Sequence, residues 1–240
     1  MKKFALITGA SGGIGAATAE RLAREGWNLY LHYNRNEDKI IELITNLKKY
    51  NIELIPIHAD LNTTAGVQIL STSVFQLDAI VYSCGTAPYG LFTDLDDKTM
   101  EDMLQLHVKS PLLLIRNLLP KLMRNATSQI VLVSSIWGQT GAACEVMYST
   151  VKGAQIAFIK ALSKETARSG TRVNCVAPGA VNTNMLDRFT AEELEELASD
   201  IPLGRLAEST EIADAIAFLL SEKSTYITGQ VLAINGGWYT

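Results

Sequence analysis

The chain has 240 residues, 48% of them hydrophobic and 19% charged, a composition typical of a folded globular protein rather than a disordered one. Its 21 basic and 25 acidic residues give a formal net charge of −4 without any basic block, which argues against a nucleic-acid-binding surface. No apolar stretch approaches the length of a membrane span. We therefore expect neither a nucleic acid nor a membrane among its partners.

The first residues bear on the cellular compartment of the protein, and the cysteines bear on disulfides and metal sites. The N-terminus, MKKFALITGASGG, carries an apolar run of only four residues, Phe4 to Ile7. A secretion signal has a longer apolar region and a cleavage site, so we expect a cytoplasmic protein. Cys84, Cys144 and Cys175 are widely spaced and form no C-x-x-C pair, which predicts buried free thiols and no metal site.

Short apolar runs alternate with helical patterns along the whole chain. The runs lack regular polar/apolar alternation, as expected for strands covered on both faces. Strands are predicted over residues 4–8, 28–33, 52–58, 78–83, 129–135, 171–177 and 231–235. Helices are predicted over residues 13–26, 36–50, 62–76, 97–124, 146–168 and 209–221. This alternation predicts one α/β domain over residues 1–240, a doubly wound parallel sheet with helices on both faces.

Two of the predicted helices are apolar on every side, from Leu112 to Ile115 and from Ile156 to Ile159. Such a helix must be covered on every side, whereas a three-layer domain covers only one. We therefore expect a homo-oligomer, a dimer or a tetramer, in which these helices meet a second copy. Deep burial within one monomer is the alternative.

A glycine-rich segment, TGASGGIG (8–15), joins the first predicted strand to the first predicted helix. Glycines let the backbone turn tightly and approach a pyrophosphate, and the free N–H groups at the start of the helix receive the phosphates. The spacing, Gly9-x-x-x-Gly13-x-Gly15, differs from the commoner G-x-G-x-x-G. Its position at the first strand–helix junction nevertheless predicts a dinucleotide site.

The end of the second strand bears on the choice between NAD and NADP. A carboxylate there would hydrogen-bond the ribose of NAD, but the chain reads HYNRNE, with Asn34 and Arg35 and no acid before Glu37. The cation favours a 2′-phosphate, so we expect NADPH rather than NADH. The alternative is that Arg35 is an ordinary solvated residue. Asp60, after the third strand, either accepts from the adenine amine or caps the next helix.

Ser135 lies thirteen residues before Tyr148, and Lys152 follows Tyr148 by one helical turn, so the Tyr and Lys side chains would share one helix face. The glycine segment, this Ser…Tyr-x-x-x-Lys pattern, PGAVNT (178–183) and ITGQVLAINGGW (227–238) occur in order. Together they resemble the short-chain dehydrogenase/reductase family over the whole chain. The resemblance implies a Rossmann-type fold and NAD(P)-dependent reduction of a carbonyl group.

The resemblance also implies a role for each matching residue. Tyr148 would give a proton to the carbonyl oxygen, and Lys152 would lower the phenol pKa from its usual value of about 10 and hold the nicotinamide ribose. Ser135 would donate a hydrogen bond to the same oxygen. The implied cofactor site consists of Thr8, Gly9, Ser11, Gly12, Gly13, Ile14, Gly15, Asn34, Arg35, Asp60, Leu61, Ser83, Gly85, Tyr148, Lys152, Pro178, Gly179, Val181 and Thr183. Thr183 would meet the carboxamide with its hydroxyl, cap the following helix, or do both.

The chain departs from the family pattern at three places. YSCG (82–85) replaces the usual N-N-A-G, so the amides that brace the sheet are missing, while Gly85 keeps the close backbone approach. Gly12 stands where NADPH-dependent members often carry a basic residue, which speaks against NADPH. His107 stands where many members have an Asn that holds a water of the proton relay. His107 could hold that water, titrate near neutral pH and pass protons itself, or have no catalytic part.

The pattern as a whole resembles the 3-oxoacyl-acyl-carrier-protein reductases. QLHVKSP, RNLLP and SSIWGQTGAACEVMYS resemble, more narrowly, the bacterial reductases that convert the 5-aminopentanone group on modified elongation factor P to 5-aminopentanol. Trp137 and Glu145 would then lie near the substrate opening, where the carboxylate could meet an ammonium group. The alternative is a packed Trp and a solvated Glu.

Residues 186–200 are expected to form a mobile lid. Six acidic residues against one basic residue give this segment a net charge of −5, which suits a cationic partner better than an acyl carrier protein. A function of another class, a cofactor-binding regulator or scaffold without turnover, would have little need of Ser135, Tyr148 and Lys152 together. The sequence thus favours an enzyme.

Overall fold

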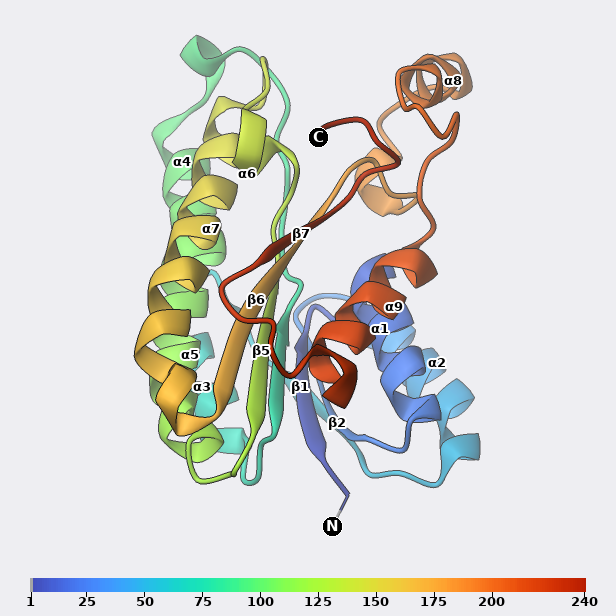
Figure 1. The fold of residues 1–240 in the computed structure, drawn as a ribbon. Coiled ribbons are helices and arrows are strands. Elements are labelled where there is room, and N and C mark those ends of the chain that lie inside the picture. The colour runs from blue at the N-terminus through green and yellow to red at the C-terminus, as the bar shows by residue number, and fades with distance from the viewer. Residues whose placement is uncertain (1) are drawn as a thin grey trace.

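A computed structural model describes residues 2–240 as a three-layer α/β domain (Figure 1). Its sheet has seven strands in the order β3-β2-β1-β4-β5-β6-β7, and every neighbouring pair is parallel. The strands are β1 (Phe4–Thr8), β2 (Asn28–Tyr33), β3 (Leu54–His58), β4 (Ala79–Tyr82), β5 (Ser128–Val133), β6 (Thr171–Pro178) and β7 (Val231–Ile234). All seven predicted strands are confirmed, with ends that differ by no more than two residues.

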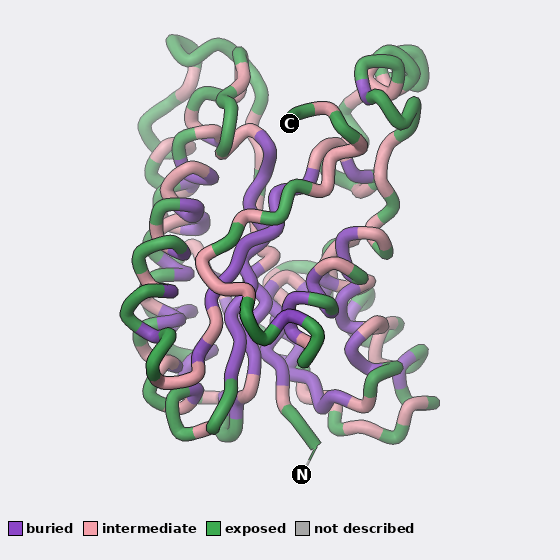
Figure 2. Tube along the Cα trace, viewed as in Figure 1, coloured by how far each residue is buried: buried purple, intermediate pink, exposed green. Residues whose placement is uncertain are grey.

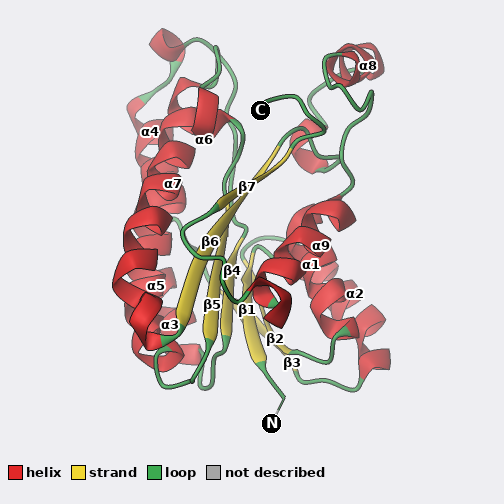
Figure 3. Cartoon of the chain, viewed as in Figure 1, coloured by secondary structure: helices red, strands yellow, loops and turns green. Residues whose placement is uncertain are grey.

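Helices cover both faces of the sheet, as predicted (Figure 3). One face carries α1 (Gly13–Arg24), α2 (Glu37–Leu47) and α9 (Ser209–Leu220). The other face carries α3 (Thr64–Ser73), α4 (Asp97–Leu104), α5 (Ser110–Leu122) and α7 (Val146–Thr166). Single 3₁₀ turns occupy Lys48–Tyr50, Phe92–Asp94, Ala167–Ser169, Asn184–Leu186 and Glu222–Ser224.

The sheet is apolar on both sides because consecutive strand residues pack against opposite helix layers. Leu6 packs with the layer of α3, α5 and α7, and its neighbour Ile7 packs with the layer of α1, α2 and α9. Both side chains are completely buried. Figure 2 shows the central strands as the buried part of the molecule, with exposed residues on the outer sides of the helices. This arrangement explains the unbroken apolar runs in the sequence.

The helix predicted over residues 97–124 is interrupted. A short π-helix, η3 (Gln105–Lys109), separates α4 from α5. Pro111, in the first turn of α5, has no N–H to donate to the carbonyl of His107 four residues earlier. That carbonyl instead accepts a hydrogen bond from the Gln155 amide of α7, at 2.8 Å. The proline therefore frees a backbone group that ties α7 to the π-helix beside the pocket described below.

Two further helices were not predicted, α6 (Trp137–Thr140) and α8 (Ala191–Ser199). The sequence does contain the signal for α8, because Thr190 and Glu193 form a reciprocal capping box at its start. The segment expected to be a lid therefore contains a regular helix. In Figure 1 this helix stands at the upper right edge of the molecule, above α9.

The two helical turns that are apolar on every side are only partly covered within one copy. Ile115 and Ile159 are buried, whereas Leu112 remains 36% exposed and Phe158 is half-buried. An apolar strip thus remains on the outer side of α5 and α7. The homo-oligomer stays a prediction, which a light-scattering measurement of the mass in solution would check.

The structure also bears on the predictions about free thiols, a metal site and a membrane span. All three cysteines are free; Cys175 is buried, whereas Cys84 and Cys144 are half-buried. Over residues 2–240 no cluster of His, Cys, Asp or Glu has the make-up of a metal site. Within the same residues, no helix has both the length and the apolar character needed to cross a bilayer.

Candidate active site

The order of the strands reverses between β1 and β4, and at such a point a crevice forms outside the carboxyl ends of a parallel sheet. A pocket of ≈ 350 Å³ opens there. It brings together Ser135 at the end of β5 with Tyr148 and Lys152 on α7, as the sequence predicted. Ten of the pocket-lining residues were predicted as site residues for cofactor or catalysis: Ile14, Ser83, Gly85, Ser135, Tyr148, Lys152, Pro178, Gly179, Val181 and Thr183.

The Lys152 side chain is held firmly at the floor of this pocket. It is 3% exposed, and its Nζ donates to the Val133 carbonyl at 2.8 Å and to Oε1 of Gln155 at 3.5 Å. The same Nζ lies 5.5 Å from the centre of the Tyr148 ring. Burial lowers the pKa of Lys152 to about 8. The side chain is thus still cationic at pH 7 but titrates far below a free lysine.

The Tyr148 hydroxyl keeps its proton at neutral pH. Burial raises the pKa of this phenol well above its usual value, and the nearby Glu145 carboxylate acts in the same direction. The Ser135 side chain lowers the pKa of Tyr148 and opposes this shift only in part, so the phenol pKa is raised and not lowered as the resemblance implied. A protonated phenol beside a lysine cation and a serine hydroxyl can give a proton to a developing oxyanion.

The glycine segment has the shape that a pyrophosphate requires. Gly9 has a φ of +68°, which favours glycine. A Cβ at Gly15 would lie 2.2 Å from the Gly9 carbonyl oxygen, so only glycine lets α1 start so close to the turn. Gly12 is the N-cap of α1 and has no side chain to occupy the free N–H groups, and no acidic residue lies in the first turn. These groups face an approaching anion unobstructed.

The loop after β6 closes over the glycine segment. A Cβ at Gly13 would lie 2.7 Å from Cγ2 of Thr183, so the two segments are in close contact. Thr183 precedes the turn Asn184–Leu186 but makes no capping hydrogen bond with its side chain. The alternative that this hydroxyl caps a helix is therefore wrong. Thr183 is instead one of the residues that line the pocket.

The ends of β2 and β3 form the adenosine side of the predicted site. Nδ2 of Asn34 donates to Oδ1 of Asp60 at 3.0 Å, and the same oxygen accepts from the Asn62 amide. Asp60 does not cap α3, because Thr63 does so by accepting from the Gly66 amide at 3.0 Å.

Two other residues predicted on this side differ in exposure. Arg35 is exposed, and within residues 2–240 its side chain makes no hydrogen bond or ion pair. The Leu61 side chain is 2% exposed and lies in the core. Leu61 could therefore meet a cofactor only through its backbone.

The pocket also contains an ion pair that the sequence did not predict. Arg188 lies 3.2 Å from Oε1 of Glu145 and donates to the Ala87 carbonyl at 2.7 Å. Its guanidinium also lies over the rings of Tyr89 and Phe189, at 5.0 and 4.8 Å from their centres. Arg188 is the single basic residue of the acidic segment 186–200. This isolated cation was the feature of the sequence from which an ion pair could have been predicted.

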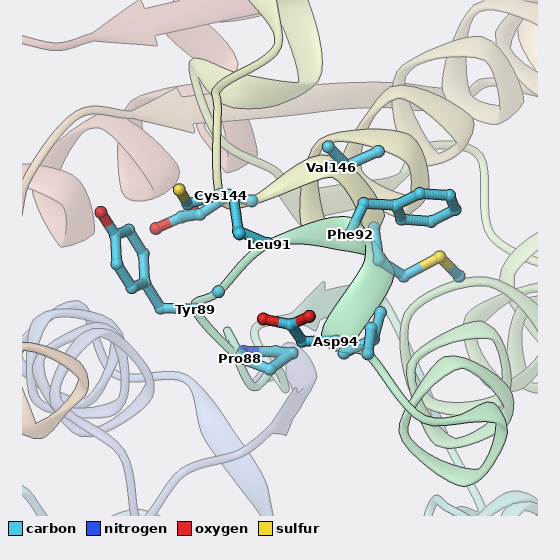
Figure 4. Close-up of a pocket in the computed structure, with 11 residues that line it drawn as sticks. Pro88, Tyr89, Leu91, Phe92, Asp94, Cys144 and Val146 are labelled. Atoms are coloured by element: carbon cyan, nitrogen blue, oxygen red, sulfur yellow. The ribbon is translucent and has the colours of Figure 1, made fainter.

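Glu145 and Trp137 both line the pocket, as predicted. The Glu145 side chain is 13% exposed, and burial raises the pKa of its carboxyl group while Arg188 lowers it. Trp137 packs edge-on against Trp238 near the C-terminus, with 5.0 Å between ring centres. A smaller hollow of ≈ 90 Å³ adjoins the pocket and shares Tyr89 and Glu145 with it; Figure 4 shows its walls. Trp137 thus both packs and lines the pocket, whereas the alternative of a solvated Glu145 is wrong.

Comparison with known proteins agrees with this geometry. The family model described as Enoyl-(Acyl carrier protein) reductase matches residues 9–239. The chain belongs to the short-chain dehydrogenase/reductase family. It is 56% identical over 241 residues to the uncharacterized oxidoreductase YmfI of Bacillus subtilis (strain 168), covering 100% of both chains. It is 32% identical over 243 residues to the 3-oxoacyl-[acyl-carrier-protein] reductase FabG of Staphylococcus aureus (strain Mu50), covering 100% of this chain and 99% of the relative.

Solved structures of similar fold are also reductases. The angucycline C-6 ketoreductase LanV with bound NADP is 28% identical with a TM-score of 0.92, covering 98% of this chain and 95% of the other. The L-sorbose reductase from Gluconobacter frateurii, complexed with NADPH and L-sorbose, is 29% identical with a TM-score of 0.92, covering 99% of this chain and 96% of the other. The protein is accordingly an oxidoreductase of the short-chain dehydrogenase/reductase type.

The structure of this oxidoreductase also shows what replaces the missing sheet-bracing amides. Ser83 donates its hydroxyl to the Thr8 carbonyl at 2.5 Å and its amide to the Thr8 hydroxyl at 3.1 Å. Tyr82 donates its hydroxyl to the Leu106 carbonyl at 2.6 Å. The ends of β1 and β4 are thus joined by hydroxyl groups. Thr8 and Ser83, predicted to bind the cofactor, carry this brace.

His107 of this oxidoreductase lies beside Tyr148. Its ring is completely buried and stands edge-on to the Tyr148 ring at 5.9 Å. Nε2 lies 3.0 Å from the Thr86 carbonyl oxygen, and among residues 2–240 Nδ1 has no hydrogen-bond partner. Burial lowers the pKa of His107 to about 3, which does not fit a residue that titrates near neutral pH. A Cβ at Gly85 would lie 2.8 Å from this ring, which explains the glycine there.

Proposed function

We propose that this protein is an NADPH-dependent carbonyl reductase that converts a ketone to an alcohol, with Tyr148 as the proton donor. The observation that carries the proposal is a single pocket in which a protonated phenol, a buried lysine and a serine hydroxyl adjoin the glycine segment. The two related solved structures described above contain NADP or NADPH. The uncapped start of α1 and the position of Thr183 at the pocket support the binding of such a dinucleotide.

Each residue of the group has its own part in the reaction. The bound nicotinamide would supply the hydride. Ser135 would hold the carbonyl oxygen and stabilise the charge that develops on it. Tyr148 would transfer its phenolic proton to that oxygen, and the Lys152 cation would stabilise the phenolate that remains. Within this scheme Nδ1 of His107 would hold a water close to the Tyr148 ring, because that nitrogen is buried and otherwise unpaired.

The preference for NADPH is proposed to rest on Arg35. Arg35→Ala should raise the KM for NADPH about tenfold or more and leave the KM for NADH nearly unchanged, since a hydrogen bond to a charged group contributes about 1.5–3 kcal/mol. Steady-state kinetics with both cofactors would measure this. Lys48→Ala is the matched control, because it removes an exposed cation from the far end of α2. Equal changes with both cofactors would show that Arg35 does not recognise the 2′-phosphate.

For the substrate we propose two candidates, each supported by its own observation. Glu145 is a largely buried carboxylate in the pocket and fits the ammonium of the 5-aminopentanone group on modified elongation factor P. Similarity over the full chain to a 3-oxoacyl-[acyl-carrier-protein] reductase favours a 3-oxoacyl thioester on acyl carrier protein. The exposed glutamates of α8 favour the first candidate, since an acidic carrier would be repelled by them.

NADPH consumption, measured in parallel with the two substrates, would decide between them. If the aminoketone is the substrate, elongation factor P carrying it should be turned over rapidly and acetoacetyl thioester slowly. Glu145→Gln should then raise the KM for the aminoketone about tenfold or more, because it removes the charge that meets the ammonium. Glu192→Gln, an exposed glutamate of α8, is the control. Turnover of the thioester alone would reject the aminoketone.

A further inference from the structure

A buried histidine outside the catalytic group lies directly beneath the glycine segment. His32, in β2, is 2% exposed. The Gly9 amide donates to its Nδ1 at 3.1 Å, and the Ala10 amide donates to its backbone carbonyl at 2.9 Å. On the other side of the ring, Nε2 lies 3.0 Å from the Ala59 carbonyl oxygen. One residue thus holds two consecutive amides of the glycine segment and links them to the chain after β3.

These contacts determine how the ring is protonated. The Gly9 N–H is a donor, so Nδ1 must present a lone pair, and the Ala59 carbonyl is an acceptor, so Nε2 must carry the hydrogen. Burial lowers the pKa of His32 to about 4, so the ring is neutral at pH 7. A neutral imidazole satisfies both backbone groups at once. No other side chain has an acceptor and a donor at these two ends of a rigid ring.

Gly9 is the residue on which the shape of the glycine segment depends. Its carbonyl accepts from the Gly12 amide at 2.9 Å and packs against Gly15, so both the turn and the start of α1 are built on this peptide. The thiol of Cys84 closes the remaining side, 3.2 Å from where a Cβ of Gly9 would lie and 3.7 Å from Nδ1 of His32. The Gly9 peptide is thus held on its carbonyl side by Gly12 and Gly15, and its amide is held by His32.

We propose that His32 is a positioning residue for the cofactor, which fixes the peptides of Gly9 and Ala10 and so holds the glycine segment in the shape that receives a pyrophosphate. This inference rests on the proposed dinucleotide-dependent function. His32 does not itself line the pocket, although its Nδ1 lies 3.7 Å from the thiol of Cys84, which does. Its effect should therefore reach the reaction only through the affinity for the dinucleotide, and not through the proton transfer at Tyr148.

Two amide variants test the geometry. The Asn oxygen of His32→Asn can take the place of Nδ1 and accept from Gly9, whereas the longer side chain of His32→Gln reaches toward the position of Nε2. Titration of NADPH fluorescence, with no ketone present, should give a Kd within about threefold of wild type for His32→Asn. The Kd of His32→Gln should be about tenfold higher or more. His58→Asn, an exposed histidine at the end of the neighbouring strand, is the control.

Two further measurements separate positioning from folding. Hydrogen–deuterium exchange in the protein without cofactor should quicken in the segment 5–15 of His32→Gln and stay unchanged elsewhere. At saturating NADPH, kcat should stay within about threefold of wild type. A Kd that is the same in both variants, or a general loss of thermal stability with unchanged Kd, would overturn the inference. If wild type fails to bind NADPH, it is the proposed function that fails; if wild type binds and His32→Gln binds equally well, only the role of His32 is rejected.

Discussion

Tyr148→Phe should lower kcat for ketone reduction about a thousandfold, because the variant lacks the proton that a general acid supplies, a contribution of about 10²–10⁴. The hydroxyl is the only group removed, and the ring still packs against His107 and Val151. Binding of NADPH should therefore change by less than about threefold. Single-turnover kinetics at saturating cofactor, combined with a fluorescence titration, would measure both quantities.

The matched control is Tyr226→Phe, which removes the hydroxyl of a fully exposed tyrosine and should leave kcat unchanged. Retention of kcat within about tenfold of wild type in Tyr148→Phe would mean that another group gives the proton. A biological effect that survives Tyr148→Phe unaltered would instead support the cofactor-binding regulator or scaffold, the alternative that the sequence left open. The experiment thus tests the assignment of the enzyme as well as the role of one residue.

Lys152→Met should lower kcat/KM about a hundredfold and change its dependence on pH. The size follows from the loss of a charge-assisted interaction of about 1.5–3 kcal/mol at the reacting group. Burial lowers the pKa of Lys152 to about 8, so the cation that stabilises phenolate is present below pH 8 and is lost as the pH rises through 8. Wild-type reduction should therefore decline above about pH 8, and the variant should lack this decline.

Methionine occupies a volume close to that of the lysine stem, so Lys152→Met tests the charge rather than the packing. Lys160→Met removes an exposed lysine two turns later on α7 and is the control, with an unchanged pH profile. An alkaline decline that persists in Lys152→Met at the same pH would assign the titration to another group. In that case the buried amine would serve only to hold the chain by its bond to the Val133 carbonyl.

Much of the architecture follows from local patterns. The seven strands were predicted because each is an apolar run whose neighbours along the chain face opposite helix layers, as Leu6 and Ile7 do. The break between α4 and α5 was missed, although Pro111 was visible, because the pattern of apolar residues continues across it. A proline four residues after a carbonyl frees that carbonyl, but only the fold shows that Gln155 is there to bond it.

The meeting of the candidate residues in one pocket was predictable for a similar reason. Tyr148 and Lys152 are one helical turn apart, and glycine is required at Gly9 and Gly15 by the backbone alone. The capping box at Thr190 also marked α8, and it was overlooked beside the acidic charge of the segment. By contrast, the capping role considered for Asp60 was wrong because Thr63, three residues later, provides the cap.

The sequence by itself determined the sheet, the glycine segment and the candidate group of Ser135, Tyr148 and Lys152, because each depends on side-chain period or on the backbone freedom of single residues. Only the tertiary structure decided that Arg188 turns back to Glu145, and that His32 supports Gly9 from the neighbouring strand. These contacts join residues 43 and 23 positions apart. No local sequence rule predicts contacts between residues so far apart along the chain. They are set by the parallel pairing of β1 with β2 and by the path of the loops at the carboxyl ends of the strands.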